Sequence, residues 1–231
     1  MLNFNCIIIR NICIFIWRIK NKNWWFNTTY NSYTGFWKGY SCRCWASEFL
    51  TNGAQSSSGT TEAETNLKIA LKLQNLLEQS GCTVILTRSD ENAIYDLDKT
   101  TLREKKISDI RNRVKIGNNS SADLFVSIHL NKIPQQQYWG WQCFYNSKNE
   151  KSINLAKKIQ ANLNESIQKE NKRVAMKLDT VYIMKHVEIP ISIVECGFLS
   201  NPEEEQQLLN DEYQNKLAWG IYNGIIAYFN E

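Results

Sequence analysis

The sequence predicts an α/β protein in which helices cover both faces of a mostly parallel, twisted sheet. Two observations lead to this prediction. Short apolar runs rich in Ile and Val, such as residues 189–194, have the composition of strands that are buried on both faces. These runs alternate with amphipathic segments of helical length, a pattern typical of parallel sheets. The pattern begins near Gly53, so we expect a single domain over residues 53–231.

The first predicted helix begins near Glu62. Thr61 and Glu64 have the spacing of a capping box, in which the threonine caps the glutamate amide and the glutamate reaches back. Apolar residues then follow at helical spacing: Ile69, Leu73, Leu76 and Leu77. Gly81 ends the run. Because the capping box accounts for Glu64, Glu62 is the carboxylate left free at the start of this helix.

The later elements alternate in the same way. Strands are predicted over residues 82–88, 123–131, 140–146, 181–184 and 191–194. A helix and turn are predicted over 102–123, and further helices over 149–168 and about 211–228. Another helix is expected to begin at Asn201, because Pro202 suits the first turn.

The composition excludes several classes of protein. Of 231 residues, 43% are hydrophobic and 22% charged, as in an ordinary globular protein. The net charge of +4 is small and comes largely from a stretch without acidic residues before Glu48, so we expect no nucleic-acid partner. The seven cysteines show neither CxxC metal spacing nor a disulfide framework. We interpret Cys82, Cys143 and Cys196 as small buried hydrophobes.

Residues 1–52 differ from the rest of the chain. Residues 6–19 are apolar but interrupted by Arg10 and Asn11, so they fit a remnant of a signal or anchor better than a transmembrane helix. Five of the eight tryptophans lie in the first 45 residues, whereas a disordered linker is poor in aromatic residues. Our hypothesis is that this leader is partly read out of frame. The alternative is an aromatic segment that lies on a membrane surface.

Three polar side chains are expected at the ends of predicted elements. Glu195 directly follows a buried strand, where a carboxylate is costly unless it is paired, metal-bound or catalytic. His129 lies near the end of a second buried strand, and Glu62 begins the first helix. Ligands bind at the carboxyl ends of strands in such sheets. Each residue also has an ordinary interpretation: a loop-capping Glu, a hydrogen-bonded core His, and a first-turn Glu favoured by the helix dipole.

Together these groups match a hydrolytic zinc site. A catalytic zinc needs three protein ligands and an open position for water. A carboxylate that does not bind the metal then takes the proton of that water. The chain has only two histidines, His129 and His186, so the pattern supplies only two evident ligands.

A family resemblance strengthens this interpretation. The segments TEAETNLKIALKL, ADLFVSIHLN and IVECGFLSNPEEE, in this order, resemble zinc-dependent N-acetylmuramoyl-L-alanine amidases of the amidase-3 type, and within them the CwlD-type, germination-specific amidases. The resemblance covers about residues 53–231 and implies a catalytic domain that binds Zn²⁺ through His, Glu and His. Matched position by position, Glu62 and His129 are metal ligands, and Glu195 is the catalytic acid and base of an E-x-G-F motif.

The sequence departs from the family pattern at one place. The family's first zinc-binding His lies in a D-x-G-H-G motif that ends the first strand, but this chain reads TGFWKGYSCRCWASEF there. We therefore expect that the first strand is missing or altered and that the chain as written binds zinc poorly. Cys42 and Cys44 are weak substitutes because they lie in the aberrant tract, and His186 lies too far along the chain.

The resemblance also implies a substrate and a location. The family cleaves the amide bond between muramic acid and the stem peptide of peptidoglycan, so we expect an extracytoplasmic protein of the cell wall or spore cortex, where peptide removal precedes muramic-δ-lactam formation. A membrane anchor at the N-terminus and an accessory protein remain open. Two other functions also remain open: a disabled peptidoglycan-binding relative, and a thiol hydrolase using Cys196 and His129. The carboxylate beside Cys196 disfavours the latter, because it would raise the pKa of the thiol.

Overall fold

The computed structural model describes residues 5–9, 12–16, 40–44, 54–90 and 92–230, with side chains from Ala54 onward. The chain divides into two compact units, Met1–Gly35 and Phe36–Glu231. In the first unit, strands β1 (Asn5–Ile9) and β2 (Ile12–Ile16) pair antiparallel. No helix in the described ranges is long and apolar enough to span a membrane.

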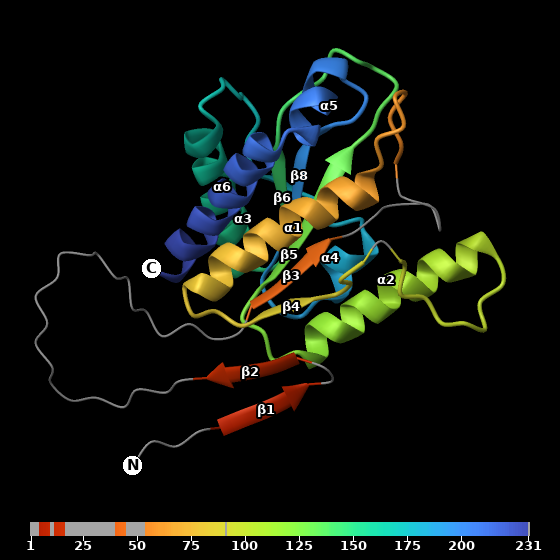
Figure 1. Ribbon diagram of the computed structural model, residues 1–231, viewed down its shortest axis with the longest axis vertical. Helices are drawn as coiled ribbons and strands as arrows, with labels where there is room; N and C mark the ends of the chain where they lie inside the picture. The colour runs from red at the N-terminus through yellow and green to blue at the C-terminus, as the bar shows by residue number, and fades with distance from the viewer. Residues whose placement is uncertain (1–4, 10–11, 17–39, 45–53, 91, 231) are drawn as a thin grey trace, which may run out of the picture. The chain divides into compact units, whose positions relative to one another are not determined.

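The second unit contains a six-stranded sheet with the order β4-β3-β5-β8-β6-β7 (Figure 1). The strands are β3 (Tyr40–Cys44), β4 (Val84–Leu86), β5 (Phe125–Asn131), β6 (Gln142–Tyr145), β7 (Met176–Lys177) and β8 (Ile191–Phe198). All neighbouring strands are parallel except β6 and β8, which pair antiparallel. The predicted α/β class with a mostly parallel sheet is therefore confirmed.

Helices cover both faces of this sheet, as the sequence predicts. They are α1 (Glu62–Gln79), α2 (Leu102–Asn119), α3 (Glu150–Ile167), α4 (Tyr182–His186), α5 (Pro202–Leu209) and α6 (Asp211–Phe229). The central strand β5 explains the two layers, because its alternate side chains enter different cores. Ile128 packs with residues of α1, α3 and α6, whereas Phe125 packs with residues of α2 and α4.

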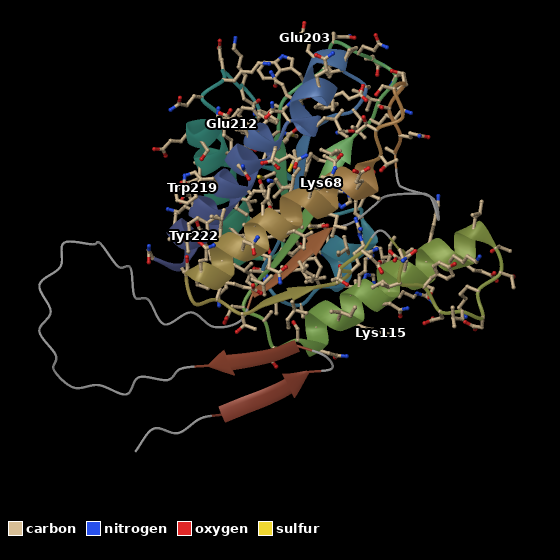
Figure 2. The ribbon with its side chains drawn as sticks, in the orientation of Figure 1. Lys68, Lys115, Glu203, Glu212, Trp219 and Tyr222 are labelled. Carbon is tan, nitrogen blue, oxygen red and sulfur yellow. The ribbon has the colours of Figure 1, made fainter. Side chains whose placement is uncertain are left out.

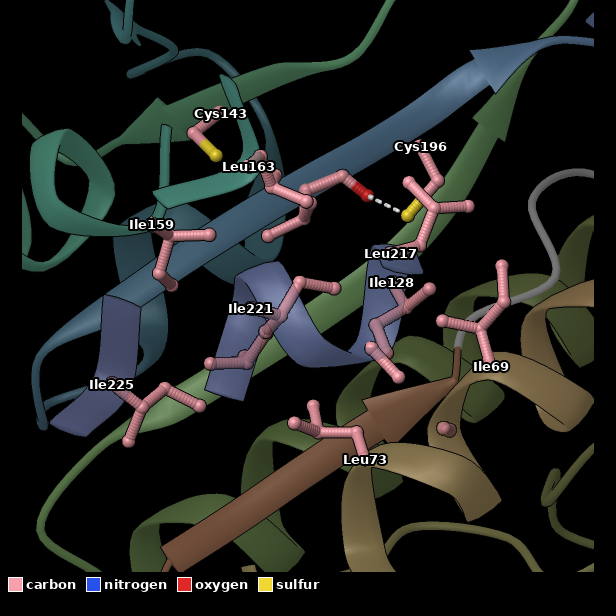
Figure 3. Packing of buried hydrophobic residues seen from close by; sticks show 14 of the residues in the cluster. Ile69, Leu73, Ile128, Cys143, Ile159, Leu163, Cys196, Leu217, Ile221 and Ile225 are labelled. Carbon is pink, nitrogen blue, oxygen red and sulfur yellow. Dashed lines mark hydrogen bonds between the residues drawn. The ribbon is translucent and has the colours of Figure 1, made fainter. Parts of the chain in front are cut away.

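The larger core lies under α1, α3 and α6 (Figure 3). Helices α3 and α6 approach closely because Gly224 has no side chain: a Cβ there would lie 2.4 Å from the Cα of Ile159. Cys143 and Cys196 are fully buried in this core, and Cys82 is 6% exposed. The prediction that these three cysteines are buried is confirmed.

One predicted strand is wrong. Tyr182, Ile183 and Met184 belong to α4, which Val181 precedes as its N-cap, and Ile183 and Met184 are buried in one cluster with Phe125 and Ile191. A run of four apolar residues has no periodicity that separates a strand from a buried helical turn. The edge strand instead comes earlier, at Met176–Lys177, where both residues are exposed.

The sequence predicts that the first strand is missing or altered, and the structure has a strand in this tract. β3 (Tyr40–Cys44), within the tract expected to be aberrant, lies between β4 and β5 and pairs parallel with both. Backbone pairing uses N–H and C=O groups that nearly every residue possesses, so a strand can form from a sequence without the usual pattern of apolar residues. Whether residues 1–52 are out of frame remains a prediction.

Candidate active site

Glu62 lies at the first position of α1 and is fully buried. Its Oε1 atom accepts hydrogen bonds from the side chain of Asn66 (3.3 Å) and the amide of Leu130 (3.4 Å), and its Oε2 atom accepts from the amide of Ala54 (3.1 Å). Several donors therefore hold the carboxylate at the start of the helix.

The neighbouring cap differs in detail from the prediction. The Thr61 hydroxyl accepts from the amide of Glu64 at 3.4 Å, as expected. The Glu64 carboxylate, however, pairs with Lys68 one turn along the surface of α1. Glu62 is thus the buried carboxylate, and Glu64 lies on the surface, where it pairs with Lys68 and does not reach back to the cap as the sequence predicted.

His129 lies in β5 and is 4% exposed. Its Nδ1 atom lies 3.2 Å from Oε1 of Glu62, and its Nε2 atom lies 3.1 Å from the hydroxyl of Ser127. Ser127 precedes His129 by two residues, so strand alternation places both on one face of the sheet. Ser127 was not predicted from the sequence as part of the site. Its position two residues before His129 in the same strand could have indicated that it contacts the imidazole.

Glu195 lies beside His129, because the two residues are partners in the parallel pairing of β5 and β8. Among the described residues, its Oε2 atom is buried and has no hydrogen-bond partner. The pKa of Glu195 is raised to about 7, mainly because the carboxyl group is buried; His129 opposes this rise and the Glu62 charge adds to it. A carboxyl group with this pKa can accept and return a proton near neutral pH.

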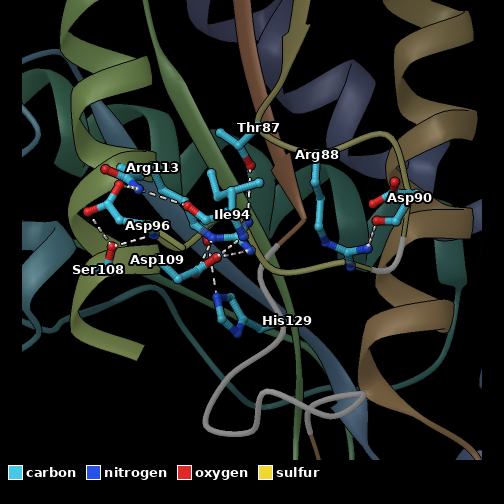
Figure 4. Close-up of polar contacts among 11 residues, drawn as sticks. Thr87, Arg88, Asp90, Ile94, Asp96, Ser108, Asp109, Arg113 and His129 are labelled. Carbon is cyan, nitrogen blue, oxygen red and sulfur yellow. Dashed lines mark hydrogen bonds and ion pairs between the residues drawn. The ribbon is translucent and has the colours of Figure 1, made fainter. Parts of the chain in front are cut away.

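Two buried arginines brace the region around the site (Figure 4). Arg113 of α2 binds both carboxylate oxygens of Asp109 and donates to the hydroxyl of Thr87 at 3.2 Å. Arg88 donates to the carbonyl oxygen of Ala63 at 2.7 Å, next to Glu62 in α1. These contacts link β4, α2 and the start of α1.

The described residues fit part of a zinc site. Two ligands about 2.1 Å from a tetrahedral zinc lie roughly 3.4 Å apart, close to the 3.2 Å between Glu62 Oε1 and His129 Nδ1. In the ranges that the structure describes, however, no group of three His, Cys, Asp or Glu side chains could hold a metal. The arrangement thus provides two donors for zinc and not a complete set.

The other residues singled out from the sequence lie elsewhere or outside the described side chains. Cys196 is fully buried in the larger core, where its Sγ atom lies 3.8 Å from the carbonyl oxygen of Val194 (Figure 3). That position removes the basis for a thiol hydrolase. His186 is exposed on α4 and stacks on Tyr182. The side chains of Cys42 and Cys44 lie outside the described part of the chain.

Comparisons with known proteins agree with this geometry. A family model described as N-acetylmuramoyl-L-alanine amidase matches residues 48–227. The germination-specific N-acetylmuramoyl-L-alanine amidase of Bacillus subtilis (strain 168) is 36% identical over 170 residues, which cover 74% of this chain and 71% of that protein.

Solved structures give the same result. The CwlD amidase from Clostridioides difficile, in complex with the GerS lipoprotein, has a TM-score of 0.78 and 40% identity, covering 83% of this chain and 99% of that chain. The N-acetylmuramoyl-L-alanine amidase from Clostridium difficile 630 has a TM-score of 0.71 and 28% identity, covering 84% and 98%.

The fold and the polar site at the carboxyl ends of parallel strands are those of an α/β enzyme. Within this class, the chain belongs to the N-acetylmuramoyl-L-alanine amidase family of peptidoglycan hydrolases. The family match begins at residue 48, after β3 ends at Cys44.

Proposed function

We propose that the protein hydrolyses the amide bond between the lactyl group of muramic acid and L-alanine, in maturation of the spore cortex. The observation that supports this most directly is the grouping of Glu62, His129 and Glu195. His129 and Glu195 are paired on the neighbouring central strands β5 and β8, and Glu62 contacts His129 from the start of α1. The similarity to the germination-specific amidase of Bacillus subtilis supports the cortex role.

In this proposal Glu195 is the general acid and base. It takes a proton from the attacking water and returns the proton to the departing alanine amine. Its buried Oε2 atom and its pKa of about 7 suit both steps. Glu62 and His129 would hold Zn²⁺, which when bound polarises the carbonyl and lowers the pKa of water.

The departure from the family's D-x-G-H-G motif supports a second candidate function. A protein that kept the fold but not the metal would bind muramyl-peptides without cleaving them. Retention of Glu62, His129 and Glu195 supports catalysis in an intact form.

Incubation of purified protein with muramyl-peptides tests both functions. An amidase releases a new alanine amine in a reaction that a zinc chelator stops, whereas a binding protein releases none at any zinc concentration. A chelator-insensitive hydrolysis would contradict both proposals.

The site of action and the partner are also proposals. We propose that the protein works outside the cytoplasm, held at the membrane by its N-terminal segment. The Clostridioides difficile CwlD amidase forms a complex with the GerS lipoprotein. An accessory protein of comparable role is therefore proposed for this chain, and co-purification from sporulating cells tests it.

A further inference from the structure

Three consecutive glutamates in the first turn of α5 have different environments. Glu203 is exposed, whereas Glu204 and Glu205 are 3% and 6% exposed. The helix needs none of these side chains for its cap, because Asn201 already accepts hydrogen bonds from the amides of Glu203 and Glu204. In the described ranges, neither buried carboxylate forms a salt bridge; both bind neutral groups instead.

Glu204 joins the end of β8 to the loop before β6. Its Oε2 atom accepts from the amide of Phe198 at 2.7 Å, and its Oε1 atom accepts from the amide of Gly140 at 2.8 Å. The carboxylate lies in the space beside Gly197, where a Cβ would come within 2.9 Å of its Cδ atom. Gly197, which lies two residues after Glu195, therefore leaves room for the Glu204 carboxylate.

Glu205 joins α5 to the segment Ala54–Thr60, which precedes α1. The hydroxyl of Ser58 donates to its Oε1 atom, and Ser58 in turn contacts Ser56 at 3.2 Å. Ser56 closes the segment, because its hydroxyl accepts from the amide of Thr60 at 2.9 Å.

This segment reaches the proposed metal ligand directly. The amide of Ala54 donates to Oε2 of Glu62 at 3.1 Å, and the amide of Glu62 donates to the carbonyl oxygen of Ala54 at 2.8 Å. A continuous series of contacts therefore runs from Glu205 through the segment to Glu62.

We propose that Glu204 and Glu205 are positioning residues that fix the two sides of the site from one helical turn. Glu204 holds the end of the strand that carries Glu195, and Glu205 holds the segment that binds Glu62. The inference rests on the proposed function only in taking Glu62 and Glu195 as site residues.

Magnetic resonance on the full chain tests the Glu205 side without zinc or turnover. At one fixed pH, Glu205→Ala should shift the imidazole signal of His129, which contacts Glu62, and leave that of the exposed His186 unchanged. Amide exchange at Ala54 should rise roughly tenfold or more, as expected when a buried charged hydrogen bond is lost. Glu205→Gln should restore both readouts, because an amide oxygen still accepts from Ser58.

Two further variants keep this test decisive. Ser58→Ala removes one hydrogen bond to Glu205 from an exposed position, while Ser56 and Thr60 still interact with that carboxylate. It should therefore shift both readouts in the same direction as Glu205→Ala, by a smaller amount, even if Glu205→Ala folds poorly. Glu203→Ala changes the exposed neighbour, drawn at the outer end of α5 in Figure 2, and should alter neither readout. A normal His129 signal in folded Glu205→Ala and Ser58→Ala would overturn the role of Glu205.

The Glu204 side has its own readout. Glu204→Gln preserves shape but offers one acceptor oxygen where the carboxylate offers two, so amide exchange should rise roughly tenfold at either Gly140 or Phe198. In a form that hydrolyses muramyl-peptides, the same variant should lower kcat with little change in KM. Unchanged exchange at both amides would overturn the role of Glu204. A repaired, zinc-competent chain that fails to hydrolyse muramyl-peptides contradicts the proposed function, while these exchange measurements on the chain as written still decide the positioning role.

Discussion

The half of the site formed by α1, β5 and β8 differs from the half next to β3. In the first half, side-chain contacts fix the groups: Glu62 accepts hydrogen bonds at both oxygens, and His129 contacts both Glu62 and Ser127. In the second half, β3 pairs with both neighbours, yet the family match starts only after it, and the sequence there reads TGFWKGYSCRCWASEF in place of the family's D-x-G-H-G motif.

This difference separates two demands on a sequence. Strand pairing uses backbone groups that almost every residue carries, so it tolerates a changed sequence. A metal ligand is a particular side chain at a particular position, and a neighbouring residue cannot replace it. A corrupted leader could therefore preserve the sheet and still remove the metal site.

Restoring the family motif in the half of the site next to β3 should have the largest effect on zinc binding and hydrolysis. If residues before about Gly53 are misread, another frame of the encoding DNA should give a β-branched strand that ends in Asp-x-Gly-His-Gly. The repaired protein should bind about one zinc per chain and cleave muramyl-peptides, and the chain as written should do neither. Metal analysis of both proteins decides this, and full zinc occupancy in the written chain would contradict it.

Changing Glu195, the proposed general acid and base, should have the next largest effect. In a zinc-competent form, Glu195→Gln should lower hydrolysis by about 10²–10⁴-fold, because an amide cannot accept the proton of water. Bound zinc and the circular dichroism spectrum should stay unchanged, since glutamine nearly preserves the shape of the side chain. Activity close to that of the parent would assign the proton transfer to another group.

Weakening Glu62, a proposed zinc ligand in the half of the site formed by α1, β5 and β8, should have a smaller effect. In a zinc-competent form, Glu62→Gln should lower zinc affinity by roughly tenfold or more, because a neutral amide oxygen replaces a charged donor. Glu64→Gln is the matched control two residues along α1, and it should lose only the surface pair with Lys68, worth less than about 1 kcal/mol. Zinc titration of both variants distinguishes the two glutamates. Loss of affinity in Glu64→Gln alone would reverse their assignment.

The sequence predicted most of the first half because its features are local. Buried runs ending in His129 and Glu195 have strand composition, and the Thr61 cap marks the start of α1. What it missed depends on tertiary contacts. The environments of Glu204 and Glu205 are set by Gly140 and Ser58, which lie far from them in the chain. The helical turn α4 was missed because its few apolar residues have no distinguishing period.

The smallest expected effect concerns stability in the absence of metal. The pKa of Glu195 is raised from 4.5 to about 7, mainly by burial, with His129 opposing the rise and Glu62 adding to it. Between these two values the folded chain keeps a proton that the unfolded chain releases, so the free energy of unfolding falls as pH rises. Glutamine does not ionise, so the Tm advantage of Glu195→Gln over the parent should grow by several degrees from acid to slightly alkaline pH. Thermal unfolding with a chelator present measures this difference, and a constant offset across that range would show that Glu195 ionises in the folded chain as easily as in the unfolded one.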